Sequence, residues 1–121
     1  MEEKEQGNLI GSDKVEGTAV YGANSEKIGS IERVMIDKMS GKVSYAVLAF
    51  GGFLGLGLGL GHDHYPIPWA SLKYDTSLGG YRTAVTEQQL KGAPKYASDS
   101  DWTWSDTTKT RGVNDYYGIP L

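Results

Sequence analysis

Apolar side chains recur at short intervals along the chain, and glycine-containing turns separate them. Residues 17–21 predict a first strand. In the run from Lys27 to Asp37 the apolar phase slips by one residue between Ile28 and Ile31, which predicts a strand with a bulge near Gly29. Some of these apolar positions also fit one face of a helix. The β-branched content and Gly29 favour the strand.

The next two segments also have the character of strands. Met39 to Lys42 predicts a hairpin turn, in which Gly41 can adopt a positive φ. The partner strand, residues 42–50, is apolar on both faces, so we expect it to be the most buried strand. The segment from Tyr65 to Trp69 contains two prolines, which predict an extended strand at a sheet edge or a strand end.

Short elements complete the pattern. Two further strands and one short helix are predicted at residues 72–75, 81–85 and 86–90. Thr86 is the expected N-cap of that helix, with Gln89 three residues on. About six short strands with close turns predict a mainly all-β fold, a small six-stranded antiparallel barrel, because closure removes exposed sheet edges.

Composition excludes several classes of function. The length of 121 residues suits one domain, and 39% hydrophobic with 22% charged residues is typical of a globular chain. The absence of cysteine removes disulfides, thiolate metal sites and cysteine nucleophiles. The net charge is −3 and the basic residues are scattered, so nucleic acid is not an expected partner.

Neither a leader nor a membrane span is expected. Residues 1–11 are interpreted as a flexible N-terminal lead, and Met1 to Asn8 lacks the apolar stretch of a secretory signal. Residues 43–61 carry no charge and are long enough to span a bilayer, but glycines crowd their second half. We therefore expect no transmembrane segment and a cytoplasmic location, while peripheral association with a membrane complex stays compatible with the sequence.

A glycine and leucine run occupies residues 55–61. Its glycines are out of register for a dinucleotide fingerprint, and no Gly-Lys-Ser/Thr ends it as in a P-loop. Alternation places the leucines on one face, where they either cover the barrel or contact another protein. The candidate contact residues in and beside this run are Leu54, Leu56, Leu58 and Leu60.

The sequence His62-Asp63-His64 is the one group that resembles a metal site. In an extended segment His62 and His64 project to the same side and could share an ion. Two ligands are fewer than the four of a structural zinc site, so the main interpretation is a polar loop, and metal binding is the alternative.

Catalytic signatures are missing from the sequence. No serine stands in a Gly-x-Ser-x-Gly elbow, and pairs such as Asp99 and Asp101 lie in polar stretches that do not tune a carboxyl for acid–base work. We therefore expect no enzyme activity and no cofactor.

The C-terminal stretch, residues 97–121, is rich in aromatic side chains. A disordered tail rarely contains so many. We expect an extended tail that packs on its own barrel or on a sister subunit, with capture of a different protein as the alternative. The candidate contact residues here are Trp102, Trp104, Tyr116 and Tyr117.

Taken together, the motifs from about Ser12 to Tyr96 resemble a PRC-barrel domain, over around 70% of the chain. The segments that carry the resemblance are Gly17–Tyr21, Lys27–Glu32, Asp37–Leu48, Phe50–Gly55, Pro66–Trp69 with Leu72 and Tyr74, and Leu90–Pro94. The ending Val113–Gly118 is also similar to a tail of stand-alone bacterial members. The resemblance implies a six-stranded antiparallel barrel over residues 12–96.

The resemblance also implies a role. The family includes the cytoplasmic domain of the photosynthetic reaction centre H subunit and the C-terminal domain of a ribosome maturation factor, which act through protein contacts. This chain lacks the membrane helix of the first and the N-terminal barrel of the second. We therefore expect a non-catalytic adaptor that binds a protein partner and forms a homodimer. The alternative is a metal- or small-ligand-binding sensor that uses the His62-Asp63-His64 loop.

Overall fold

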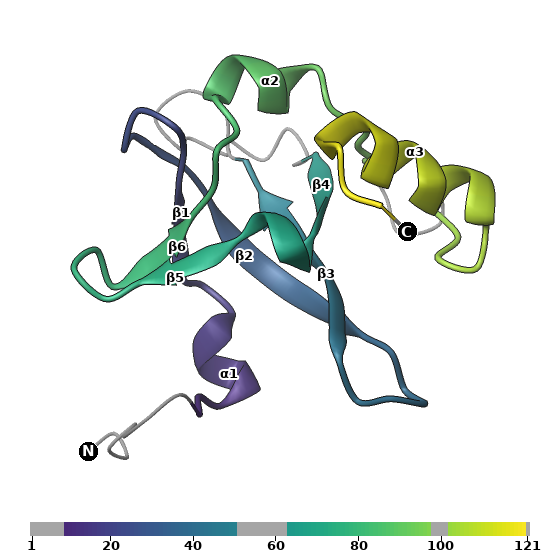
Figure 1. The fold of residues 1–121 in the computed structure, drawn as a ribbon, viewed down its shortest axis with the longest axis horizontal. Helices are drawn as coiled ribbons and strands as arrows, with labels where there is room; N and C mark the ends of the chain where they lie inside the picture. Colours follow the sequence, from purple (N-terminus) through teal and green to yellow (C-terminus); the bar gives the residue numbers. More distant parts are fainter. Residues whose placement is uncertain (1–8, 51–62, 98–101, 121) are drawn as a thin grey trace.

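The computed structural model describes residues 9–50, 63–97 and 102–120, which form one strongly bent six-stranded sheet with short helices around it (Figure 1). The strands are β1 (Ala19–Tyr21), β2 (Lys27–Ile36), β3 (Val43–Ala49), β4 (His64–Pro68), β5 (Lys73–Asp75) and β6 (Gly80–Arg82). The helices are α1 (Ser12–Val15), the 3-10 turn η2 (Trp69–Ser71), α2 (Glu87–Lys91) and α3 (Thr107–Tyr117). The mainly β class is as predicted.

The prediction of a closed, purely antiparallel barrel is wrong. The strand order is β4-β3-β2-β1-β6-β5, and within the described residues β4 does not pair with β5. β1 and β6 pair in parallel, while the other neighbours are antiparallel. The cause is the connection after β4. The chain passes through η2 to the opposite edge without reversing, so β5 keeps the direction of β4, and β6 then runs parallel to β1.

The predicted bulge in β2 is confirmed. Val20 faces Gly29 and Tyr21 faces Lys27, so Ile28 is an extra residue in the ladder with β1. A Cβ at Gly29 would lie 2.7 Å from the carbonyl oxygen of Ala49, which explains the glycine at this position. The bulge places Ile28 on the buried side although it is out of phase with the rest of the strand.

β3 packs with both faces, as its apolar pattern predicts. Ala46, Val47 and Leu48 are all fully buried. Ala46 and Leu48 belong to the main core, inside the bend of the sheet, whereas Val47 belongs to a second cluster. The main core also contains Val20, Ile28, Ile31, Tyr65, Ile67 and Leu90. β4, with its two prolines, is an edge strand as expected.

The predicted capping box of α2 is present. The Thr86 hydroxyl accepts a hydrogen bond from the backbone N–H of Gln89, and the Gln89 side chain accepts one from the Thr86 N–H. This arrangement satisfies two backbone donors at the start of a helix of five residues. Leu90 on its inner face is fully buried in the main core.

The expectation of one helix and an extended C-terminal tail is wrong, because residues 107–117 form α3. The Asp106 carboxylate accepts a hydrogen bond from the Thr108 N–H and caps the start of the helix. Gly118, at φ 70°, ends it in the left-handed conformation. Among the described residues, no helix is long and apolar enough to cross a bilayer.

Candidate functional site

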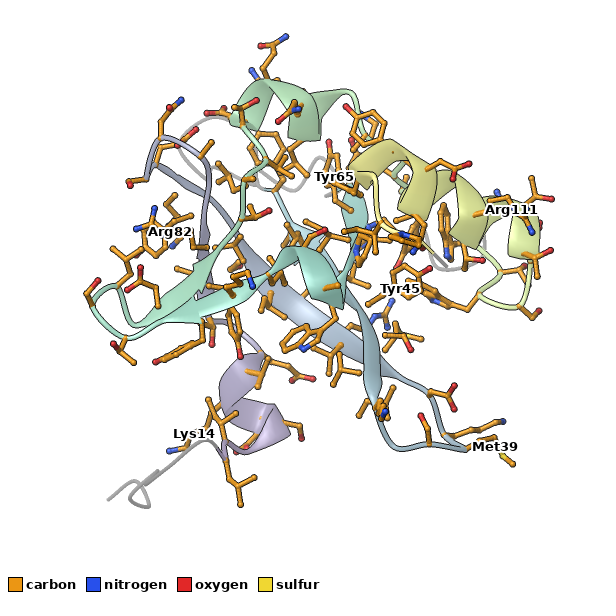
Figure 2. All side chains as sticks on the ribbon, in the orientation of Figure 1. Lys14, Met39, Tyr45, Tyr65, Arg82 and Arg111 are labelled. Carbon is orange, nitrogen blue, oxygen red and sulfur yellow. The ribbon has the colours of Figure 1, made fainter. Side chains whose placement is uncertain are left out.

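The outer face of the β3–β4 edge carries a second hydrophobic cluster. Val47 from β3 packs with Tyr96, Trp102 and Val113, all of which follow the sheet in sequence. Val47 and Val113 are fully buried. Figures 1 and 2 show α3 lying along this edge, beside β4. The C-terminal segment therefore covers the second apolar face of β3.

A series of stacked rings runs through this cluster. His64 stacks on Tyr96 at 5.0 Å between ring centroids, and Tyr96 stacks on Trp102 at 5.2 Å. Trp102 then meets Trp104 edge to face at 5.7 Å, and Trp104 meets Tyr45 at 5.5 Å. Aromatic pairs in these geometries each contribute about 0.5–1.5 kcal/mol beyond their burial. The series connects β4 to β3 through the segment that precedes α3.

Polar contacts fix α3 in its position. The Tyr45 hydroxyl donates to Oδ1 of Asn114, a side chain that is 5% exposed, and Nδ2 of Asn114 donates to the carbonyl of Pro120 at 3.4 Å. Burial raises the pKa of Tyr45, so its hydroxyl stays protonated as the donor. The Tyr116 hydroxyl donates to the carbonyl of Gln89 at 2.5 Å, which ties α3 to α2.

The predicted contact residues divide by exposure. Trp102 is only 9% exposed, and Trp104 and Tyr117 are partly buried, so these three pack on their own chain. Tyr116 is 43% exposed. The other candidates, Leu54, Leu56, Leu58 and Leu60, lie outside the described residues. Contact with another chain through this set stays a prediction.

The candidate metal ligands have separate partners where the structure describes them. Nδ1 of His64 lies 2.6 Å from Oε1 of Glu32, and Oδ2 of Asp63 lies 3.1 Å from Nζ of Lys95. His62 is outside the described residues. In residues 9–50, 63–97 and 102–120, no three His, Asp or Glu side chains come together as metal ligands would. Metal binding by His62 and His64 stays a prediction.

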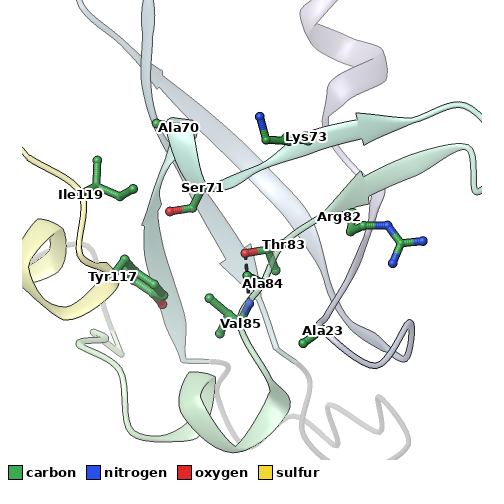
Figure 3. A pocket seen from close by; sticks show the side chains of 10 residues that line it. All are labelled: Ala23, Ala70, Ser71, Lys73, Arg82, Thr83, Ala84, Val85, Tyr117 and Ile119. Atoms are coloured by element: carbon green, nitrogen blue, oxygen red, sulfur yellow. Dashed lines mark hydrogen bonds between the residues drawn. The ribbon is translucent and has the colours of Figure 1, made fainter.

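Asn114 and Val113 position the C-terminal segment, and the sequence reasoning did not identify them. One signal was available: a strand that is apolar on both faces needs a second layer to cover it. The polar composition of residues 107–112 hid the helix that supplies this layer. No sequence pattern indicated the cavity shown in Figure 3 or the residues that line it.

Comparison with known proteins gives two matches. An uncharacterized protein of Deinococcus radiodurans is 25% identical over 87 residues, which cover 72% of this chain and 29% of that protein. The chain thus spans less than a third of the length of this relative. The family model for the PRC-barrel domain matches residues 7–89, which is more than half of the chain. The chain therefore belongs to the PRC-barrel family.

Proposed function

We propose that this protein is a non-catalytic, cytoplasmic adaptor that acts through protein–protein contacts and forms a homodimer. Family membership supports the general role as a protein-interaction module. The proposed contact surface consists of Leu54, Leu56, Leu58 and Leu60 together with Tyr116. We choose this surface because of the position at which the chain segment that contains these leucines joins the sheet.

This segment leaves and re-enters the sheet at one point. Ala49, the last residue of β3, pairs with His64, the first residue of β4. Next to this pair, Asp63 forms an ion pair with Lys95 in the segment that follows α2. The leucines are therefore tethered at the end of the sheet where α2 lies (Figure 1).

The exposed tyrosine belongs to the same end of the molecule. The hydrogen bond from Tyr116 to Gln89 holds its ring next to α2, with the ring 43% exposed. Exposed aromatic rings are frequent anchors in protein interfaces. In the proposal, the four leucines and this tyrosine together make the apolar surface through which two copies bind. A second copy presents the same surface, so a symmetric dimer covers both at once.

The ionisable side chains of the described residues support a non-catalytic role. The two carboxyl groups with a lowered pKa are Asp37 and Asp75. In both cases the cause is hydrogen bonding inside a turn: from the backbone N–H groups of Ser40 and Met39 to Asp37, and from Ser77 to Asp75. A general acid needs the opposite shift, produced by burial.

Sedimentation velocity over a range of concentrations tests the proposal. We expect a reversible dimer for the natural chain and a monomer for the double variant Leu56→Ser/Leu58→Ser. Met39→Ser is the matched control, because Met39 is 91% exposed at the tip of the β2–β3 hairpin (Figure 2), which lies away from α2 (Figure 1). It should leave the dimer intact. A natural chain that stays monomeric at every concentration, or a Met39→Ser variant that alone dissociates, would contradict the proposal.

A further inference from the structure

A cavity of about 570 Å³ lies between η2, the chain that follows β6, and the C-terminal end of α3. Figure 3 shows Tyr117 and Ile119 on one side of it and Thr83 and Val85 on the other, with Ser71 above. Pockets that hold small ligands usually have volumes of roughly 300–1,000 Å³. The cavity is therefore large enough for a small organic molecule.

The lining combines apolar walls with a few hydroxyl groups. Val85 and Ile119 supply aliphatic surface. The Ser71 hydroxyl points to the side of the cavity where Ile119 lies, and no described residue is its partner (Figure 3). The Tyr117 hydroxyl is buried and has no hydrogen-bond partner among the described residues. An apolar cavity with a small number of unpaired donors is the usual composition of a ligand site.

The charged side chains that line the cavity are of one sign. Lys73 and Arg82 are the charged residues of the lining, and both are basic. Arg82 is already held by the Asp75 carboxylate at 3.2 Å and by Ser25. Lys73 forms no ion pair with any described residue. Its ammonium group is thus the charge that a bound anion would neutralise.

We propose that this cavity binds a monocarboxylate with an apolar chain. The aliphatic chain would lie between Val85 and Ile119, and the carboxylate would accept a hydrogen bond from the Ser71 hydroxyl. Lys73 is exposed, and its ammonium group points above β5 in Figure 3, so this long side chain would turn toward the bound carboxylate. An amine of the same length would meet the positive charge of Lys73, and a neutral alcohol would gain from burial alone. The inference goes beyond the proposed adaptor role, because it gives the domain a small-molecule ligand.

Titration calorimetry with octanoate tests the proposal, with 1-octanol and octylammonium as probes of equal chain length. We expect octanoate to bind with one molecule per chain, 1-octanol to bind more weakly, and octylammonium not to bind. Lys73→Ala should weaken octanoate binding by roughly two- to fivefold, the effect of one exposed charge pair, and leave the binding of 1-octanol unchanged. Amide chemical shifts of Ser71, Thr83 and Ile119 should move on addition of octanoate.

Two blocking variants test the location of the site. Ala84→Trp and Ala70→Trp each place a large ring at an exposed position of the lining, where folding tolerates it, and each should abolish octanoate binding. Ala97→Trp, at an exposed alanine outside the lining, is the matched control and should bind as the natural chain does. Circular dichroism verifies that all three variants are folded.

The results that overturn the proposal are distinct from those that overturn the adaptor role. Absence of binding by octanoate, equal binding by octylammonium, or unchanged binding in both folded tryptophan variants would each refute the carboxylate site. Leu56→Ser/Leu58→Ser, which tests the dimer, should bind octanoate with unchanged affinity. A monomeric chain that still binds octanoate would overturn only the dimer, and a dimer that does not bind it would overturn only the carboxylate site.

Discussion

Tyr96 stacks on Trp102, with ring centroids 5.2 Å apart and ring planes inclined by 27°. The backbone of Tyr96 exchanges two hydrogen bonds with His64, at 2.8 and 3.0 Å, so the ring is held against the edge strand β4. Trp102 belongs to the C-terminal segment, outside residues 7–89 that match the family model. This contact makes the C-terminal segment part of the folded domain.

Trp102→Ala should therefore destabilise the whole domain. The side chain is 9% exposed, and its loss removes a packing partner of Tyr96 and leaves a cavity in the cluster that also contains Val113. We expect the free energy of unfolding in urea to fall by about 3 kcal/mol. Met39→Ala, at a 91% exposed position, should change it by less than about 0.5 kcal/mol. Equal stability of the two variants would show that the C-terminal segment is not part of the fold.

The hydrogen bond between Tyr45 and Asn114 should appear as a coupling energy. Asn114→Ala leaves the partly buried Tyr45 hydroxyl without its acceptor, which costs about 1 kcal/mol. Tyr45→Phe removes the hydroxyl as well, so the double variant should lose less stability than the sum of the single variants, by at least about 0.5 kcal/mol. Urea unfolding of the natural chain, the two single variants and the double variant gives the coupling energy. Strict additivity would mean that the two side chains do not interact.

Two glycine substitutions should change the stability of the fold in opposite directions. Gly29→Ala places a Cβ 2.7 Å from the carbonyl oxygen of Ala49 and should destabilise the fold by about 1–3 kcal/mol, because the ladder must move. Gly112→Ala meets no atom within 4 Å and lies inside α3, so the higher helix propensity of alanine should stabilise the domain by about 1 kcal/mol. Thermal unfolding compares the two. A destabilising Gly112→Ala would be evidence against a helix at residues 107–117.

The turn between β5 and β6 should make stability depend on pH. The Ser77 hydroxyl donates to the Asp75 carboxylate at 2.6 Å, and this bond, with smaller contributions from the Ser77 N–H and Arg82, lowers the pKa of Asp75 below 3.8. The ionised carboxylate thus stabilises the folded state above pH 3.8, and this contribution is lost as the pH falls through the lowered value.

Asp75→Asn should accordingly lower the melting temperature at neutral pH, and the difference from the natural chain should shrink below pH 3.8. Ser77→Ala, which removes the strongest of the hydrogen bonds, should show a smaller difference with the same pH dependence. Thermal unfolding followed by circular dichroism at several pH values gives the melting-temperature difference of each variant. A difference that persists unchanged down to about pH 2 would show that Asp75 does not stabilise the turn.

Local patterns in the sequence predicted much of this fold. The bulge near Gly29, the edge position of the strand that contains Pro66 and Pro68, and the capping box at Thr86 depend on neighbouring residues, and the structure confirms all three. Each feature involves steric or hydrogen-bonding constraints within a few residues, which is why a single sequence reveals it.

The features that were not predicted depend on contacts between distant residues. The parallel pairing of Val20 with Tyr81 follows from the direction in which η2 carries the chain, and no local pattern records that direction. α3 carries recognisable capping signals at Asp106 and Gly118, but its stability comes from Val113 packing in one cluster with Val47 on the outer face of β3. The cavity beside Ser71 likewise forms only when β6 and the end of α3 meet.

We propose that two copies of this chain associate through the end of the domain that carries α2. The chain contains no cysteine, so one introduced cysteine carries a single spin label for each copy. Double electron–electron resonance then compares a label at Gln88, exposed on α2, with a label at Met39 on the β2–β3 hairpin (Figure 2). We predict a shorter distance between the two Gln88 labels than between the two Met39 labels. A shorter Met39 distance, or no dipolar coupling between copies at either site, would contradict the claim.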